Sequence, residues 1–166
     1  MNRNFIFVFI LLAALSLVNA MPHELRKRTT SFKQCPNSKL ANVPILDVTI
    51  SPDPVVSGAS DTFTVSGTLE KDIVETTPLV IEFFDASGTV LGTPYAEPIC
   101  GTSGGPDCPI KAGTKFTTTA TITAPDSLPS QYFIGVAVAE SPEVALGCAV
   151  ADVGSTSSKM PIMLPF

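Results

Sequence analysis

Few side chains in this sequence have the types and spacing that catalysis needs. The only histidine, His23, lies near the amino terminus, and no glycine-rich nucleotide loop is present. The acidic residues Asp53, Asp61, Glu82 and Asp85 are expected in turns or on the outward faces of strands, where water would solvate them. Acid–base catalysis needs carboxyl groups in contrasting environments, at least one of them apolar. We therefore expect that the protein is not an enzyme.

The amino terminus has the features of a secretory signal peptide at residues 1–20. Arg3 supplies a positive charge, an apolar run of 14 residues extends from Phe5 to Val18, and Ala20 ends a small-residue cleavage motif. A membrane anchor is the alternative, but this run is shorter than the ~20 residues that span a bilayer. We expect the chain to be secreted, or to reside in the lumen of a vacuole-like or endosomal compartment.

A second processing site follows the signal peptide. The cluster Leu25-Arg26-Lys27-Arg28 resembles a furin- or kexin-type site, so residues 21–28 are a candidate propeptide and Thr29 is the candidate mature end. The alternative is a solvated basic patch that stays in place. The domain is then expected at 29–166, with its core at about 33–153 and a flexible carboxyl-terminal tail.

Residues 29–166 are strongly acidic. They contain six lysines, no arginine and 14 acidic residues, which gives a net charge of −8. This charge excludes nucleic acid as a partner and a polybasic mode of membrane binding, since both need clustered Lys and Arg. The chain has no Asn-x-Ser/Thr site, so N-glycosylation is not expected. We expect the protein to be a monomer.

Four cysteines, Cys35, Cys100, Cys108 and Cys148, point to disulfide bonds. An even number is typical of secreted disulfide-bonded chains, and no Cys-x-x-Cys pair or neighbouring histidine is present to bind zinc. Three pairings are possible. The Gly- and Pro-rich loop between Cys100 and Cys108 favours a bond between these two, which leaves Cys35 to bond Cys148. We expect no metal and no other cofactor.

Strand patterns fill the body of the chain. Runs rich in Val, Ile, Thr and Phe are separated by Pro and Gly, and no window shows a clear 3.6-residue apolar period. The predicted strands lie near residues 45–50, 61–69, 78–85, 89–95, 115–123, 131–140 and 144–153. Short strands at this spacing predict an all-β, immunoglobulin-like sandwich of about seven strands.

Alternation gives each predicted strand a face that points between the two sheets. The residues predicted to share that face are Phe63, Val65, Leu69, Leu79, Ile81, Phe83, Phe116, Ala120, Ile122, Ile134, Val136, Val138, Leu146, Cys148 and Val150. Periodicity does not distinguish a close-packed core from one that encloses a cavity, so both remain open at this point.

Three segments resemble the ML lipid-recognition family, which includes the group 2 mite allergens, the Niemann-Pick cholesterol carrier and fungal phosphatidylglycerol/phosphatidylinositol transfer proteins. Residues 50–69 look like the family's strand, Pro-rich turn and second strand. Residues 108–113 (CPIKAG) resemble its Cys-Pro-Ile/Leu-Lys-x-Gly signature, and residues 128–132 (LPSQY) resemble its Pro-containing entrance to a late strand. Cys148 falls where the family has its last-strand cysteine.

Two departures from the family pattern bear on the subtype. The chain lacks the extra cysteine pair of many members, and Ser130 stands where glycine is frequent. Four cysteines and a short propeptide look closest to the fungal phospholipid-transfer type.

The resemblance implies a lipid-binding protein that carries a phospholipid (phosphatidylglycerol or phosphatidylinositol) or a sterol between membranes, through transient membrane contact. The lipid would occupy an apolar cavity between the sheets, lined by Phe63, Val65, Ile81, Phe83, Phe116, Ile122, Ile134, Val136, Val138, Leu146 and Val150. Lys111 and Lys115, beside the 100–108 loop, are candidates to hold a phosphate head group at the rim, or else are ordinary solvated lysines. The alternative function is an immunoglobulin-like secreted interaction module with a filled core and no lipid.

Overall fold

The computed structural model describes residues 29–36, 42–101, 105–141 and 144–154. The predicted signal peptide and propeptide, and the tail from residue 155, lie outside these residues. The described part of the chain contains no helix, and so none that is long and apolar enough to cross a membrane. Its eight strands are β1 (Phe32–Lys33), β2 (Asp47–Ser51), β3 (Ser60–Thr68), β4 (Pro78–Phe84), β5 (Val90–Pro98), β6 (Lys115–Thr123), β7 (Tyr132–Ser141) and β8 (Val144–Val153).

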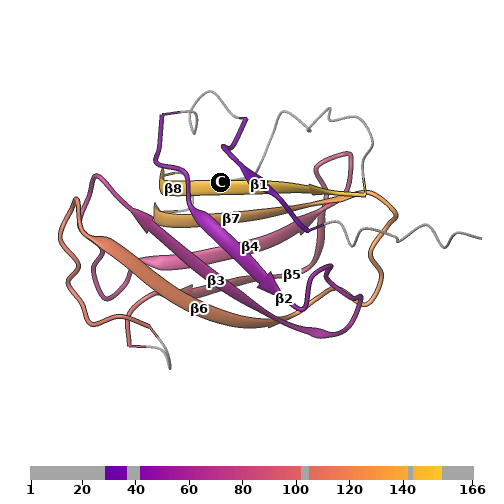
Figure 1. Ribbon diagram of the computed structural model, residues 1–166, viewed down its shortest axis with the longest axis horizontal. Helices are drawn as coiled ribbons and strands as arrows, with labels where there is room; N and C mark the ends of the chain where they lie inside the picture. The colour runs from indigo at the N-terminus through magenta and orange to yellow at the C-terminus, as the bar shows by residue number, and fades with distance from the viewer. Residues whose placement is uncertain (1–28, 37–41, 102–104, 142–143, 155–166) are drawn as a thin grey trace, which may run out of the picture.

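The strands form two sheets that lie one over the other (Figure 1). The larger sheet has the order β1-β8-β7-β4-β5, and the smaller has the order β2-β3-β6. All neighbouring strands are antiparallel. The predicted all-β sandwich is confirmed, and its seven predicted strands correspond to β2–β8. The short strand β1, which pairs with β8, was not predicted.

The alternation of β6 shows how the sequence forms the inner face of the small sheet. Lysine and threonine occupy every second position and are exposed, whereas the positions between them are buried against the other sheet. The buried side chains of β6 are Phe116, Thr118, Ala120 and Ile122. Thr118 is the one polar member of this inner row. β6 pairs with β3 over nine positions, so the inner rows of the two strands lie side by side.

β8 departs from strict alternation at Leu146. Val138 of β7 pairs with Gly147, and Ala139 pairs with Ala145, so Leu146 is an extra residue without a partner in β7. Such a bulge resets which face the following side chains occupy. Leu146 packs between the sheets, but Cys148 and Val150 pack on the opposite, outer face of the large sheet. The predicted inward placement of Cys148 and Val150 is therefore wrong.

The outer face of the large sheet is covered by the amino-terminal segment. Cys35 forms a disulfide with Cys148, and Cys100 forms one with Cys108, which is the pairing that the spacing favours. The Leu46 amide donates to the Cys148 carbonyl (3.3 Å), and the Cys148 amide donates to the Pro44 carbonyl (3.1 Å). The chain thus pairs briefly with β8 before it enters β2 of the other sheet, and this crossing joins the two layers along one edge.

Candidate functional site

The interior between the sheets is the first candidate site, and it contains nearly all of the residues predicted to line a cavity. All eleven are buried, with at most 8% of any side chain exposed. Ten of them belong to one continuous cluster with the other inward residues of both sheets. The eleventh, Val150, lies in the separate cluster on the outer face, because of the bulge in β8.

Aromatic rings cross the interior from one sheet to the other. The Phe63 ring of β3 meets the Phe83 ring of β4 edge-on, with 6.5 Å between centroids. The Phe83 ring then contacts the Tyr132 ring of β7 at 6.2 Å, with a tilt of 38°. Phe63 and Phe83 were predicted in this position. Tyr132 was not, although it has the same phase as Ile134 and Val136 in its strand.

Asp61 lies inside this apolar interior, contrary to the expectation that it would be exposed. It is fully buried on β3, in the same phase as Phe63 and Val65. Neither carboxyl oxygen has a hydrogen-bond partner among the described residues, and burial raises the pKa of Asp61. The pKa of Tyr132 is raised by burial and by the negative charges of Asp61 and Asp53.

The other three acidic residues of interest lie in different settings. Asp53 accepts hydrogen bonds from the Thr30 amide (2.8 Å) and hydroxyl (2.6 Å). Asp85 is in a turn, as expected, where bonds from Ser87 and Thr89 lower its pKa. Glu82 was expected to be exposed but is half-buried on the outer face of β4, and burial raises its pKa. These carboxylates do not converge on one site.

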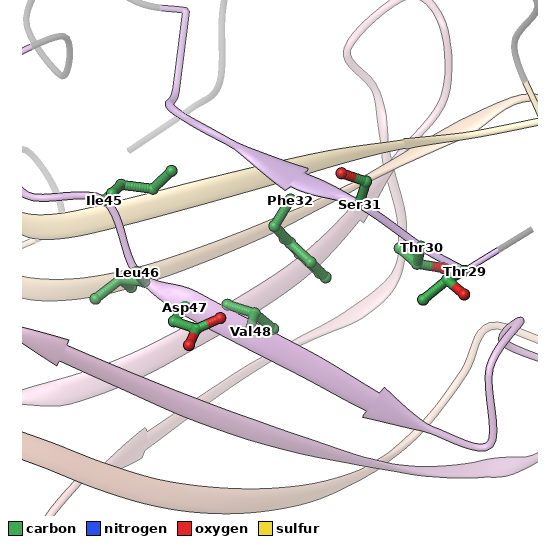
Figure 2. Close-up of a pocket in the computed structure, with 8 residues that line it drawn as sticks. All are labelled: Thr29, Thr30, Ser31, Phe32, Ile45, Leu46, Asp47 and Val48. Carbon is green, nitrogen blue, oxygen red and sulfur yellow. The ribbon is translucent and has the colours of Figure 1, made fainter.

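A groove between β1 and β2 is the second candidate site (Figure 2). Its volume is about 550 Å³, and it is lined by Thr29, Thr30, Ser31, Phe32, Ile45, Leu46, Asp47 and Val48. Figure 2 shows the Phe32 side chain extending from β1 toward β2, where Val48 lies. Phe32, Leu46 and Val48 also pack on the cluster between the sheets, so the floor of the groove is continuous with the interior. None of the eleven predicted residues lines this groove.

The two candidate head-group lysines lie apart from this groove in the sequence and differ from each other. Lys111 donates to Asp72 at 2.7 Å and is 72% exposed, whereas Lys115 begins β6 and forms no salt bridge within the described residues. The nearby pocket at the Cys100–Cys108 disulfide, of about 350 Å³, is lined by two acidic side chains, Glu75 and Asp107. This acidic lining does not favour an anionic group.

The sequence between Cys100 and Cys108 contains a Gly-x-Ser-x-Gly pattern at residues 101–105. A nucleophilic serine in such a pattern stands on a turn from a strand into a helix and needs a histidine as its base. Here the described segments on either side lead from β5 to β6, and the sequence has no histidine after residue 23. The pattern therefore gives no support to a hydrolase.

Comparison with known proteins identifies the family. The sequence matches the family model of the ML domain over residues 29–154, whereas no curated protein sequence matches it. The fold is similar to that of a Niemann-Pick type C2 protein from the Japanese carpenter ant, with a TM-score of 0.51 and 17% identity over 74% of this chain and 97% of that one. It is also similar to chicken MD-1, solved in complex with lipid IVa, with a TM-score of 0.46 and 16% identity over 74% of this chain and 86% of that one.

At these identities the structural likeness concerns the fold alone. The match to the family model is the stronger evidence for the family, because the matched residues, 29–154, contain all eight strands, both disulfides and the groove between β1 and β2. Of the three sequence motifs that resembled the family, residues 50–69 cover the end of β2, the turn after it and β3, and residues 108–113 begin at the Cys100–Cys108 disulfide. On these grounds the chain belongs to the ML domain family.

Proposed function

We propose that the protein is a non-enzymatic carrier that holds a phospholipid or a sterol between its two sheets and moves it from one membrane to another. The observation that carries this proposal is the cluster of buried apolar side chains that both sheets of an ML-domain sandwich contribute. Membership of the ML family supports a lipid-binding role. The apolar interior supplies the surface that a lipid tail needs.

The energetics of lipid exchange explain why an apolar interior suits a carrier. Moving a lipid tail into water costs about 0.8 kcal/mol per methylene, or about 13 kcal/mol for sixteen carbons. A carrier therefore has to cover the tail, but its affinity need only approach that of the bilayer, where the tail is already in hydrocarbon. Near-equal affinities allow both uptake and release.

The groove between β1 and β2 gives this interior a route to the surface. Its apolar residues Phe32, Leu46 and Val48 pack on the inter-sheet cluster, and its volume falls in the range of about 300–1,000 Å³ that is usual for small-molecule sites. The β1 side of the groove is formed by a strand of only two residues, which pairs with β8 alone. Little pairing has to break for this edge to open, so we propose that a lipid enters and leaves here.

The finer assignments are part of the proposal. The four cysteines and the short propeptide favour the fungal phosphatidylglycerol/phosphatidylinositol transfer type. Two disulfides are typical of oxidising compartments, which supports secretion or a lumenal location after removal of residues 1–20 and cleavage before Thr29. Lys111 and Lys115 are the proposed rim groups, with Lys111 exchanging Asp72 for a lipid phosphate.

Transfer of a fluorescent phospholipid between vesicles tests the proposal. Val136 is fully buried between the sheets, so Val136→Asp places an unpaired charge in the apolar interior. Because such a charge costs several kcal/mol, we expect transfer to fall by roughly tenfold or more. Thr119→Asp is the matched control, since it adds the same charge on the exposed face of β6 and should leave transfer unchanged.

A filled core is the alternative, and the same samples distinguish it. Organic extraction of the purified wild-type protein should release lipid if the carrier proposal holds. A folded wild-type protein that yields no lipid on extraction and transfers neither phospholipid nor sterol would favour the interaction module instead.

A further inference from the structure

Asp61 breaks the apolar inner row of β3. It pairs with Ile122 of β6 and is followed on the same face by Phe63 and Val65, both of which are fully buried. Asp61 itself has no exposed surface. Its side chain therefore points between the sheets, at the end of the sandwich where β3 begins and β6 ends (Figure 1).

The Asp61 carboxyl group has nothing to bond within the described protein. Both oxygens are buried and without a hydrogen-bond partner. Buried polar groups in folded proteins nearly always have partners, and an unpaired one needs an explanation such as a bound molecule. The carboxylate of Asp53, by contrast, accepts two hydrogen bonds from Thr30. If this strand position served packing alone, an apolar side chain such as those of Phe63 and Val65, two and four residues further along β3, would fill it better.

A second polar side chain is packed into the same cluster of rings. Tyr132 is 94% buried, and its ring contacts Phe83, which in turn meets Phe63, two residues after Asp61 on β3. The charges of Asp61 and Asp53 also raise the pKa of Tyr132, after burial. A phenol both donates and accepts a hydrogen bond. The interior is thus mostly apolar, and its polar side chains include Asp61 of β3, Tyr132 of β7 and Thr118 of β6.

The charge at this end selects the chemistry of the group that would bind there. A carboxyl group accepts hydrogen bonds whether or not it is ionised, and the ionised form only accepts them, so a partner that suits both forms must be able to donate. A phosphate or a fatty-acid carboxylate would meet the like charges of Asp61 and Asp53, and the net charge of −8 on residues 29–166 opposes it further. An alcohol hydroxyl donates a hydrogen bond and carries no charge.

We propose that Asp61, in the same packed cluster as Tyr132, is an interior anchor that accepts a hydrogen bond from the uncharged hydroxyl group of a lipid alcohol. This inference rests on the proposed function and narrows its ligand class, from lipids in general to lipids with a free hydroxyl at the end that enters the protein. The anchor fixes the orientation of the ligand, because the hydroxyl end lies against β3 and β7 inside the sandwich.

The test compares each alcohol with its methyl ether, which has the same apolar body but no donor. The full-length secreted protein is incubated with phosphatidylcholine vesicles that contain radiolabelled cholesterol, dioleoylglycerol or the methyl ether of either, and protein-bound lipid is measured after the vesicles are floated away. We expect wild type to take up at least one alcohol roughly tenfold better than its ether, the preference that one charge-assisted hydrogen bond gives.

Asp61→Leu then assigns this preference to the anchor. The variant should fold at least as stably as wild type, bind the ether as well as before, and show an alcohol-to-ether ratio near one. Asp61→Asn, which keeps an acceptor of the same shape, should retain part of the preference and serves as the second variant if Asp61→Leu fails to fold.

The outcomes separate this inference from the proposed function. Equal uptake of alcohol and ether by wild type would overturn the anchor, and so would an unchanged ratio in Asp61→Leu. If wild type takes up phosphatidylglycerol or phosphatidylcholine but neither alcohol, the anchor is wrong while the carrier function stands. If wild type takes up no lipid at all, both are wrong.

Discussion

Asp61 is a carboxylic acid on an otherwise apolar strand face, and its ionisation should be visible in the stability of the protein. Burial raises its pKa above the usual 3.8, so the folded state binds this proton more tightly than the unfolded chain does. The free energy of unfolding therefore falls as the pH rises above 3.8 and through the raised pKa. The raised pKa of Glu82 acts in the same direction, whereas the lowered pKa values of Asp72 and Asp85 act in the opposite one.

Comparison of wild type with Asp61→Asn isolates this contribution, because the other three acids are common to both proteins. We expect Asp61→Asn to be the more stable at pH 7, by about 1–3 kcal/mol, because the amide is buried without a charge, whereas burial of the ionised carboxylate costs more than burial of a neutral polar group. The difference should shrink toward pH 4. Urea unfolding of delipidated protein at several pH values measures it, and a difference that does not depend on pH would contradict the burial of an ionisable Asp61.

Gly147 is a second residue whose identity is set by its surroundings. A Cβ atom at this position would lie 2.7 Å from Leu69 Cδ2 and 2.9 Å from Leu46 Cδ2, both of which belong to buried side chains. We expect Gly147→Ala to destabilise the protein by about 1–3 kcal/mol through overpacking. The double variant Gly147→Ala/Leu69→Ala should lose less unfolding free energy than the sum of the losses of the two single variants, as measured by chemical denaturation. Additive losses would show that the methyl group finds space elsewhere.

These two residues show what the sequence could reveal at this scale. The phase that makes Phe63 and Val65 inward also makes Asp61 inward, so the pattern contained its position, and the expectation of exposure followed only from its charge. The pattern did not contain the position of Tyr132 relative to Asp61, because the two lie on different sheets. Position 147 needs glycine because Leu46, just before β2, and Leu69, just after β3, pack against it. These residues are distant in the sequence, so no local pattern predicts the contact.

At the scale of strands, prediction succeeded where an element is defined by its own alternation. β6 and β3 have long alternating runs, and their apolar inner residues were correctly assigned, whereas the polar residues Asp61 and Thr118 in the same inner rows were not. β8 failed after Leu146, because the bulge depends on its register with β7 rather than on its own residues. β1 was missed because two residues carry no periodicity, and it exists only through pairing with β8 beside the Cys35–Cys148 bond.

The two disulfides should contribute unequally to stability, because they close loops of very different length. Cys35 and Cys148 are separated by 113 positions, whereas Cys100 and Cys108 are separated by 8. Chain-entropy arguments give the long bridge an advantage of about 2 kcal/mol. We expect the Cys35→Ala/Cys148→Ala double variant to lose about 2–5 kcal/mol of unfolding free energy, and the Cys100→Ala/Cys108→Ala double variant to lose less. Equal losses would mean that the short loop stabilises by local contacts instead.

At the scale of the whole molecule, the distribution of charge bears on how the proposed carrier would meet a membrane. The groove lies at one edge of the sandwich, between β1 and β2, and β5 forms the opposite edge of the large sheet. The net charge of −8 on residues 29–166 opposes approach to an anionic bilayer from any side. A change of net charge therefore does not reveal which edge of the sandwich contacts the membrane, whereas a change of charge at one edge does.

Salt tests the global part of this argument. Raising the ionic strength from about 0.01 to 0.15 M shortens the screening length from about 30 to 8 Å. We expect the rate of lipid transfer to vesicles rich in phosphatidylglycerol to rise severalfold over this range, whereas the rate to phosphatidylcholine vesicles stays nearly constant. Transfer to anionic vesicles that slows as salt is added would instead indicate attraction through a local basic site such as Lys111 and Lys115.

Two matched charge reversals test the docking edge. Asp47 lies at the groove on β2 and Glu97 lies on β5, and both are exposed, so Asp47→Lys and Glu97→Lys change the net charge by the same amount at opposite edges. If lipids pass through the groove, Asp47→Lys should speed transfer to anionic vesicles severalfold more than Glu97→Lys does at low salt. The advantage should vanish at about 0.15 M salt, because screening then acts within roughly 8 Å. Equal effects of the two variants would mean that only net charge matters, and a larger effect of Glu97→Lys would place the docking edge at β5 and remove the groove from the transfer route.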